Sequence, residues 1–96
     1  SEQSSVLVVD DVEANRDLLS RRLQRQGHDV VLAENGKQAI ELVQKQEFDL
    51  ILCDIMMPEM NGYQVLEYLK ADPKLRYIPV IIVSAMSELD SIVRCI

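Results

Sequence analysis

The 96-residue sequence predicts an α/β protein built on a parallel β-sheet. Four short apolar runs rich in β-branched residues alternate with segments of helical periodicity, and this alternation is typical of strands joined by right-handed helical crossovers. The apolar runs are continuous, which indicates strands covered by helices on both faces. A chain of this length makes one domain, which buries roughly two-thirds of the surface that its unfolded form exposes.

The first predicted unit is a strand at residues 6–9 followed by a helix over residues 13–26. Gly27 follows this helix and is suited to a left-handed cap. By helical spacing we expect the buried side of the helix to be formed by Ala14, Leu18, Leu19 and Leu23.

The second unit is a strand at residues 29–33 and a helix that begins after Asn35. Asn35 is a good N-cap, and Gln38 stands where its side chain can reach back to the cap. The expected buried face of this helix comprises Ala39, Ile40 and Val43.

The third unit is a strand at residues 50–53, a loop around Pro58 and a helix that begins after Asn61. Asn61 and Gln64 repeat the capping arrangement of the second helix. Asp72 and Pro73 end this helix, whose apolar residues are Val65, Leu66 and Leu69.

The fourth strand is predicted at residues 80–83, with Pro79 at its start, where a missing backbone donor does little harm. A last helix is expected to begin at Ser87. The fourth strand is too hydrophobic for a bare sheet edge, so we expect it to be covered. The apolar positions of the last helix are Leu89, Ile92, Val93 and Ile96.

Composition excludes several classes of function. Ten basic against sixteen acidic residues give a net charge of −6, which disfavours nucleic acid and anionic membranes and favours cations and basic partners. The longest apolar stretch, at residues 78–83, is far too short to span a bilayer. Two cysteines without metal-ligand spacing do not make a disulfide framework, so we expect a soluble protein of the reducing cytoplasm.

Three carboxylates follow two of the predicted strands. Asp10 and Asp11 come after the first strand, and Asp54 comes after the third. If these strands are parallel neighbours, the acids meet at one edge of the sheet. Two such charges about 4 Å apart repel by roughly 4 kcal/mol at an effective dielectric of about 20. A divalent metal is the best compensation for this charge.

Three motifs occur in order, each at the end of a predicted strand: VVDD at residues 8–11, DIMMPEMNG at residues 54–62 and VSAM at residues 83–86. Together they resemble the receiver domain of bacterial response regulators over the whole chain. The resemblance implies a flavodoxin-like doubly wound sheet. It also implies that Asp54 accepts a phosphoryl group from a histidine kinase or a histidine phosphotransfer protein.

The resemblance also implies the roles of individual residues. Mg²⁺ requires near-octahedral oxygen ligation, and the expected ligands are Asp10, directly or through water, Asp11, Asp54 and the backbone carbonyl of Met56. Ser84 is expected to donate its hydroxyl to the phosphoryl group and to move its loop when it does so.

The family carries a lysine at the end of a fifth strand, and this sequence ends before that strand. We therefore expect residues 1–96 to be a receiver domain truncated after the start of the fourth helix, with strand order 2-1-3-4 and impaired switching. Losing the fixed positive charge should weaken phosphoryl stabilisation by a few kcal/mol.

Other functions compete with this interpretation. An assembly module would form a homodimer through the fourth strand or the last helix. A metal-dependent phosphohydrolase would place its nucleophile on the first strand and needs cap elements for which the chain has no room. A dinucleotide enzyme is disfavoured because no glycine-rich turn follows the first strand. We expect self-catalysed phosphorylation at most, without turnover of a substrate.

Overall fold

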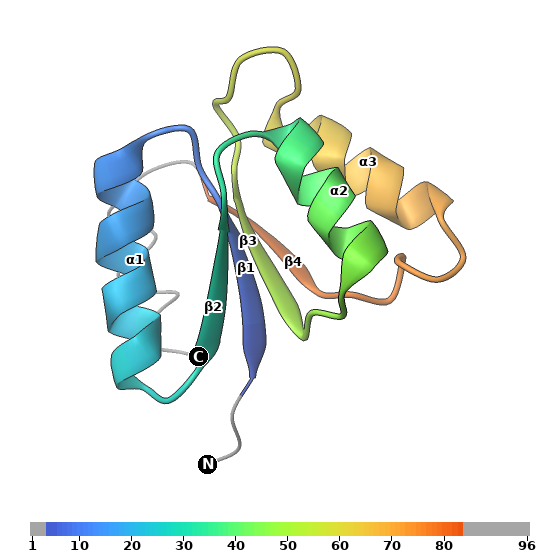
Figure 1. The fold of residues 1–96 in the computed structure, drawn as a ribbon. Coiled ribbons are helices and arrows are strands. Elements are labelled where there is room, and N and C mark those ends of the chain that lie inside the picture. Colours follow the sequence, from blue (N-terminus) through green and yellow to red (C-terminus); the bar gives the residue numbers. More distant parts are fainter. Residues whose placement is uncertain (1–3, 84–96) are drawn as a thin grey trace.

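The computed structural model describes residues 4–83 and shows a four-stranded parallel sheet with helices on both faces (Figure 1). The strands lie in the order β2-β1-β3-β4, which confirms the predicted α/β class and the order of the first four strands. Their bounds are Ser5–Val9 for β1, Asp29–Ala33 for β2, Leu50–Asp54 for β3 and Val80–Val83 for β4.

The register of the sheet places the carboxyl ends of the strands side by side. Val9, the last residue of β1, pairs with Ala33 of β2 and with Cys53 of β3. Asp54, the last residue of β3, pairs with Val83 of β4. The loops that follow the strands therefore leave the sheet at one edge, where open α/β sheets carry their sites.

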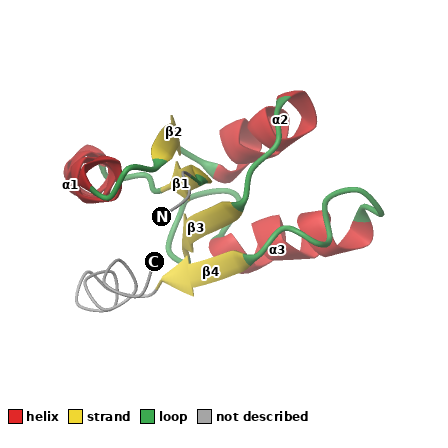
Figure 2. Cartoon of the chain, turned by 90° about the horizontal axis from the view of Figure 1, so that it is seen from below, coloured by secondary structure: helices red, strands yellow, loops and turns green. Residues whose placement is uncertain are grey.

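Within residues 4–83, one helix covers one face of the sheet and two helices cover the other. Helix α1, Glu13–Arg25, lies on one face, and helices α2, Gly36–Lys45, and α3, Gly62–Ala71, lie on the other (Figure 2). Successive strand residues point to opposite faces. In β1, Val6 and Val8 therefore pack in the core beneath α1, and Leu7 and Val9 pack in the core beneath α2 and α3.

Two helices begin with the predicted side-chain caps. The Asn35 Oδ1 atom accepts a hydrogen bond from the Gln38 amide at 2.8 Å. Asn61 and Gln64 form a complete capping box, with reciprocal hydrogen bonds of 3.0 Å and 2.9 Å. At the other end of α1, Gly27 adopts a φ of 91°, in the left-handed region that glycine enters without steric cost.

The buried face of α1 differs from the expected one. Leu19 and Leu23 are buried as predicted, but Leu18 is 45% exposed and Ala14 is also exposed. The third buried position is taken by Arg16. Residues 16, 19 and 23 share one side of a helix, and it is this side that faces the sheet. Leu18 lies about 100° around the helix from Leu19.

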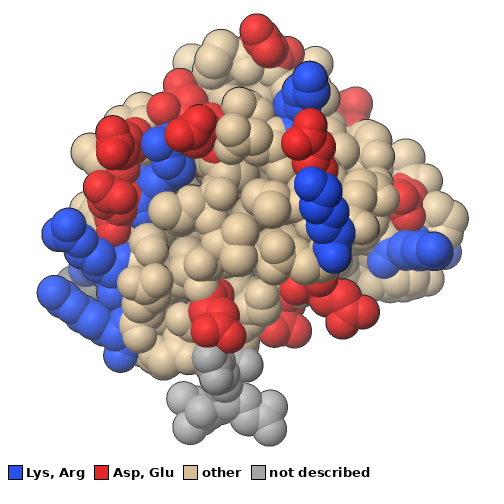
Figure 3. All heavy atoms as spheres, viewed as in Figure 1, with Lys and Arg blue, Asp and Glu red and all other residues tan. Residues whose placement is uncertain are grey.

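Acidic and basic residues lie at opposite ends of α1. Its first turn contains Glu13, and its last turn contains Arg22 and Arg25. In Figure 3 acidic side chains accordingly gather over the start of the helix and basic ones over its end. This distribution complements the helix macrodipole.

Some sequence predictions fall outside the described residues. Ser84 and the last helix, expected from Ser87 onward, belong to this group. Within residues 4–83, none of the helices has the length and apolar character needed to cross a membrane.

A side chain at position 62 would clash with the backbone of Asp54 and Ile55. An added Cβ would lie 2.5 Å from the carbonyl oxygen of Asp54. We expect Gly62→Ala to lower the free energy of unfolding by about 1–3 kcal/mol, as overpacking does, measured by urea denaturation.

Gly36 is the matched control, because it also follows a capping asparagine and precedes a glutamine by two residues. Its added Cβ would meet only the Met60 side chain, at 2.9 Å. A flexible methionine can move aside, so Gly36→Ala should lose less than Gly62→Ala. Equal losses in the two variants would contradict this account.

Candidate metal centre

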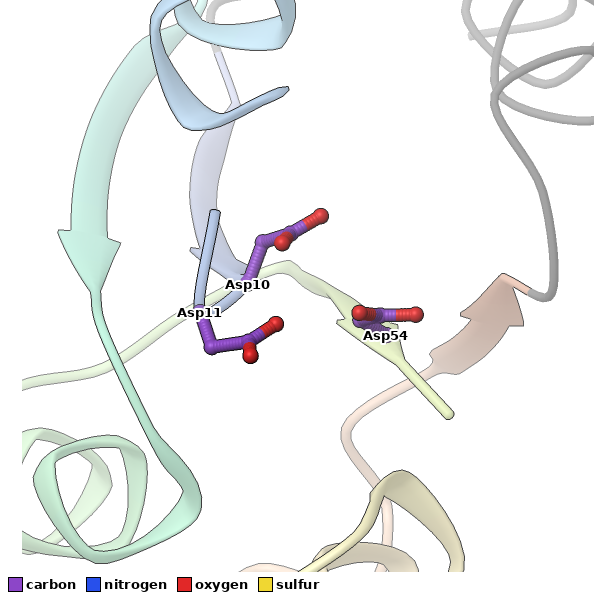
Figure 4. Close-up of side chains that lie close together, drawn as sticks. All are labelled: Asp10, Asp11 and Asp54. Atoms are coloured by element: carbon purple, nitrogen blue, oxygen red, sulfur yellow. The ribbon is translucent and has the colours of Figure 1, made fainter. Parts of the chain in front are cut away.

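Three carboxylates come together at the carboxyl edge of the sheet (Figure 4). Asp10 directly follows β1, Asp11 is the next residue, and Asp54 is the last residue of the neighbouring strand β3. Each offers a carboxylate oxygen, and these oxygens lie within 4.8 Å of one another. The pairing of β1 with β3 thus brings acids 43 positions apart in the chain into one cluster, which we call the acid pocket.

The three acids occupy different environments. Asp10 is buried, and its Oδ1 atom accepts a hydrogen bond from the Val12 amide at 2.8 Å. Asp11 is exposed. Asp54 is half-buried, and its Oδ1 atom accepts a hydrogen bond from the Met56 amide at 3.3 Å.

Arg16 holds the turn that carries the first two acids. Its Nη1 atom donates a hydrogen bond to the backbone carbonyl of Asp10 at 2.7 Å, and its Nη2 atom lies 3.7 Å from a carboxylate oxygen of Glu34. The apolar pattern did not indicate this residue, because charged positions of an amphipathic helix ordinarily face solvent. The available signal was an arginine three positions before Leu19 and seven before Leu23, on the stripe that faces the sheet.

The electrostatics of the pocket favour a cation. Partial burial raises the pKa of Asp54, and the charges of Asp10 and Asp11 raise it further, against the lowering effect of the Met56 amide. Burial, with smaller contributions from Asp54 and Asp10, raises the pKa of the Cys53 thiol to about 12. Cys53 packs in the core beneath α2 and α3, so its sulfur is no ligand for this pocket.

The donor set fits a hard divalent cation. Carboxylate oxygens are the ligands that Mg²⁺ and Ca²⁺ prefer, and the pocket offers three of them in reach of one another. Met56 is 74% exposed in the loop after β3, and its amide rather than its side chain contacts Asp54. Ser84 lies outside the described residues, so the structure does not place its hydroxyl.

The fold and the acid cluster together define an α/β domain with a carboxylate pocket at the ends of its strands. Residues 6–96 match the sequence profile of the response regulator receiver domain. Among curated proteins, the chain is 40% identical over 83 residues to the polar-differentiation response regulator DivK of Brucella anthropi, covering 86% of this chain and 68% of DivK. The chain belongs to the response regulator receiver domain family.

Longer relatives and solved structures agree with this assignment. The chain is 42% identical over 81 residues to the response regulator PleD of Caulobacter vibrioides, covering 84% of this chain but only 18% of PleD. Its fold is similar to the N-terminal domain of a response regulator receiver protein from Methanoculleus marisnigri, with a TM-score of 0.82, 34% identity, and coverage of 92% and 75% of the two chains. A receiver domain of a histidine kinase from Syntrophus aciditrophicus gives a TM-score of 0.80 and 32% identity, with coverage of 96% and 72%.

The raised pKa of Asp54 predicts a pH-dependent effect of removing its charge. An acid whose pKa is higher in the folded chain stabilises the fold while protonated, and this contribution is lost as the pH rises through the folded pKa. At pH 7 without divalent ions, Asp54→Asn should therefore raise the free energy of unfolding by about 1 kcal/mol, the repulsion of two charges a few Å apart in water.

Urea denaturation at pH 7 and at pH 3 measures this difference. Below about pH 4, the ordinary range of an aspartate, the wild type is protonated as well and the gain should vanish. Asp17→Asn, at an exposed position of α1, makes the same change of charge away from the pocket and should have little effect at either pH. A gain in Asp54→Asn that persists at pH 3 would contradict the electrostatic explanation.

Proposed function

We propose that this chain is a phosphoacceptor module that takes a phosphoryl group from a phosphohistidine partner onto Asp54. The observation that carries the proposal is the convergence of Asp10, Asp11 and Asp54, with oxygens within 4.8 Å of one another, in a chain of the receiver family. Receiver domains in general interact with histidine kinases or histidine phosphotransfer proteins, and we extend this partnership to the present chain.

Asp54 is the acid best placed to act as nucleophile. In the transfer, one of its carboxylate oxygens forms a bond to phosphorus while the bond between phosphorus and the histidine nitrogen breaks. The electron pair of that bond returns to the imidazole, which then takes up a proton. Asp54 is half-buried at the end of β3, so part of its surface remains accessible to a phosphoryl donor.

Two anions must approach each other in this reaction, and the pocket already holds three negative charges. In our proposal Mg²⁺ is held by Asp10, Asp11 and Asp54 together with the Met56 carbonyl. When bound, Mg²⁺ neutralises the charges of the acceptor and of the incoming phosphoryl oxygens, which is the main requirement of phosphoryl transfer. The amide of Met56, already turned toward Asp54, is a donor for a phosphoryl oxygen.

The proposed switch involves Ser84. A hydroxyl that donates to the phosphoryl group would be drawn toward Asp54, and its loop would follow. Ser84 directly follows β4, whose last residue Val83 pairs with Asp54. The carbonyl of Val83 also accepts a hydrogen bond from the Ile55 amide at 3.1 Å. The end of β4, at Val83, is therefore held beside the acceptor strand.

Phosphoryl transfer to Asp54 can be tested directly. Phosphoramidate is a small donor whose phosphorus–nitrogen bond imitates phosphohistidine. With Mg²⁺ it should add one phosphoryl group per wild-type chain, detected by intact-mass spectrometry, and Asp54→Asn or EDTA should abolish the addition. Asp49→Asn is the control, because Asp49 lies just before the opposite end of β3, where its carboxylate accepts from the Ser5 amide. Labelling that persists in Asp54→Asn would exclude the proposed acceptor.

Assembly is a second candidate function, favoured by the position of β4. Within residues 4–83, β4 is one of the two edge strands of the sheet, and Val80, Ile81 and Ile82 are only half-buried. Exposed apolar edges of this kind favour pairing with another chain. The alternative predicts a homodimer whose fraction rises with concentration.

Light scattering across a wide concentration range tests the assembly function. Ile81→Lys places a charge on the edge strand and should shift the equilibrium toward monomer. The matched control is Leu32→Lys, on the opposite edge strand β2 at a residue that is 38% exposed. A wild-type chain that stays monomeric throughout would exclude this function and leave phosphoryl transfer unaffected.

A further inference from the structure

Arg16 is a buried charged side chain for which phosphoryl transfer, as described above, has no use. Among residues 4–83, the buried charged residues are Asp10 and Arg16. A buried charge is costly unless it is paired and hydrogen-bonded. The interaction partners of Arg16 therefore show how its buried charge is compensated.

The main partner of Arg16 is backbone. The 2.7 Å hydrogen bond from Nη1 to the Asp10 carbonyl is buried and short, as charge-assisted bonds are. The ion pair with Glu34 is longer, at 3.7 Å, and the Glu34 side chain is 64% exposed. An exposed pair of this length contributes little, so the Asp10 carbonyl is the contact that matters.

This bond completes the fixation of Asp10. The Asp10 amide donates to the Ala33 carbonyl at 3.1 Å, its Oδ1 atom accepts from the Val12 amide at 2.8 Å, and its carbonyl accepts from Arg16. Asp10 and the adjacent Asp11 thereby keep their place opposite Asp54, although the three charges repel one another.

We propose that Arg16 is a positioning residue that tunes the acid pocket for a small divalent cation. This inference rests on the cation-dependent function proposed above. Mg²⁺ demands near-ideal octahedral geometry, whereas Ca²⁺ accepts six to eight ligands in flexible arrangements. A turn held by Arg16 therefore favours Mg²⁺ over Ca²⁺, and a loosened turn reduces that preference.

The positioning role and a purely electrostatic role predict effects of opposite sign. A guanidinium near the pocket repels a cation, so removing its charge alone should strengthen the binding of Mg²⁺ and Ca²⁺ alike. If Arg16 positions the turn, its removal weakens binding and affects Mg²⁺ more. The loss for an outer contact of a metal ligand is typically about tenfold or more.

The experiment titrates the wild-type chain and its variants with Mg²⁺ and, separately, with Ca²⁺, following backbone amide shifts by NMR. Arg16→Met keeps an unbranched stem and leaves the Asp10 carbonyl without its donor. Arg21→Met, at an exposed position of the same helix, makes the same substitution and the same change of net charge. We expect Arg16→Met to weaken Mg²⁺ binding about tenfold and Ca²⁺ binding less, whereas Arg21→Met leaves the Mg²⁺/Ca²⁺ ratio unchanged.

Three results would overturn the inference: unchanged or tighter Mg²⁺ binding in Arg16→Met, an equal fall for the two ions, or the same behaviour in Arg21→Met. If the Arg16→Met spectrum shows an unfolded chain, Arg16→Lys decides the question. A lysine keeps the charge but cannot span both partners, so weaker Mg²⁺ binding in this variant supports positioning and wild-type binding overturns it.

The wild-type and Asp54→Asn titrations separate this inference from the proposed function. A wild type that does not bind Mg²⁺ removes both proposals. Mg²⁺ binding that depends on Asp54 but not on Arg16 removes only the positioning role. If Mg²⁺ binding depends on Arg16 but phosphoramidate does not label the chain, the positioning role is supported and the acceptor role of Asp54 is excluded.

Discussion

The constraint on which the structure depends is the parallel pairing of β1 with β3, which forces three carboxylates to one point of the sheet edge. Two unit charges about 5 Å apart repel by about 1 kcal/mol even in the dielectric of water. This repulsion is a sizeable fraction of the free energy of unfolding of a typical domain, which is about 5–15 kcal/mol. The strand tolerates it because residues 6–9 of β1 are almost completely buried and paired on both sides. The folded carboxylate cluster therefore retains this repulsion, and a cation held by the three acids would offset it.

Both walls of the pocket are held by backbone hydrogen bonds. On the β1 side these involve the Asp10 amide and carbonyl. On the β3 side, the Ile55 amide donates to the Val83 carbonyl and the Gly62 amide donates to the Ile55 carbonyl, each at 3.1 Å. The close approach of α3 to the Asp54 carbonyl requires a residue without a side chain at Gly62. These hydrogen bonds fix the positions of the carboxylates in the absence of a ligand. Such preorganisation is a requirement of a precise metal site.

The sequence predicted most of this architecture because its signals are local. Continuous β-branched runs indicated the strands, and the Asn-x-x-Gln pairs indicated two helix starts that the structure shows with their hydrogen bonds. The inner face of α1 was partly wrong because Leu18 and Leu19 both satisfy an apolar pattern, and the pattern alone does not decide which of them faces the sheet. The choice follows from Arg16, whose partner is the backbone of another segment. Periodicity can place Arg16 on the buried stripe, but it does not show which backbone group the side chain contacts.

The three acids lie in different environments, which suits them to two different roles, holding a metal ion and attacking phosphorus. Asp10 is buried and has a carboxylate oxygen engaged by the Val12 amide, so it is suited to hold a fixed position. Asp11 is exposed and can adjust to a hydrated ion. Asp54 combines partial burial with a raised pKa caused first by desolvation, so its carboxylate is more basic than that of an ordinary aspartate. In the proposed function, this more basic carboxylate is the one that attacks phosphorus, while Arg16 keeps Asp10 and Asp11 in place.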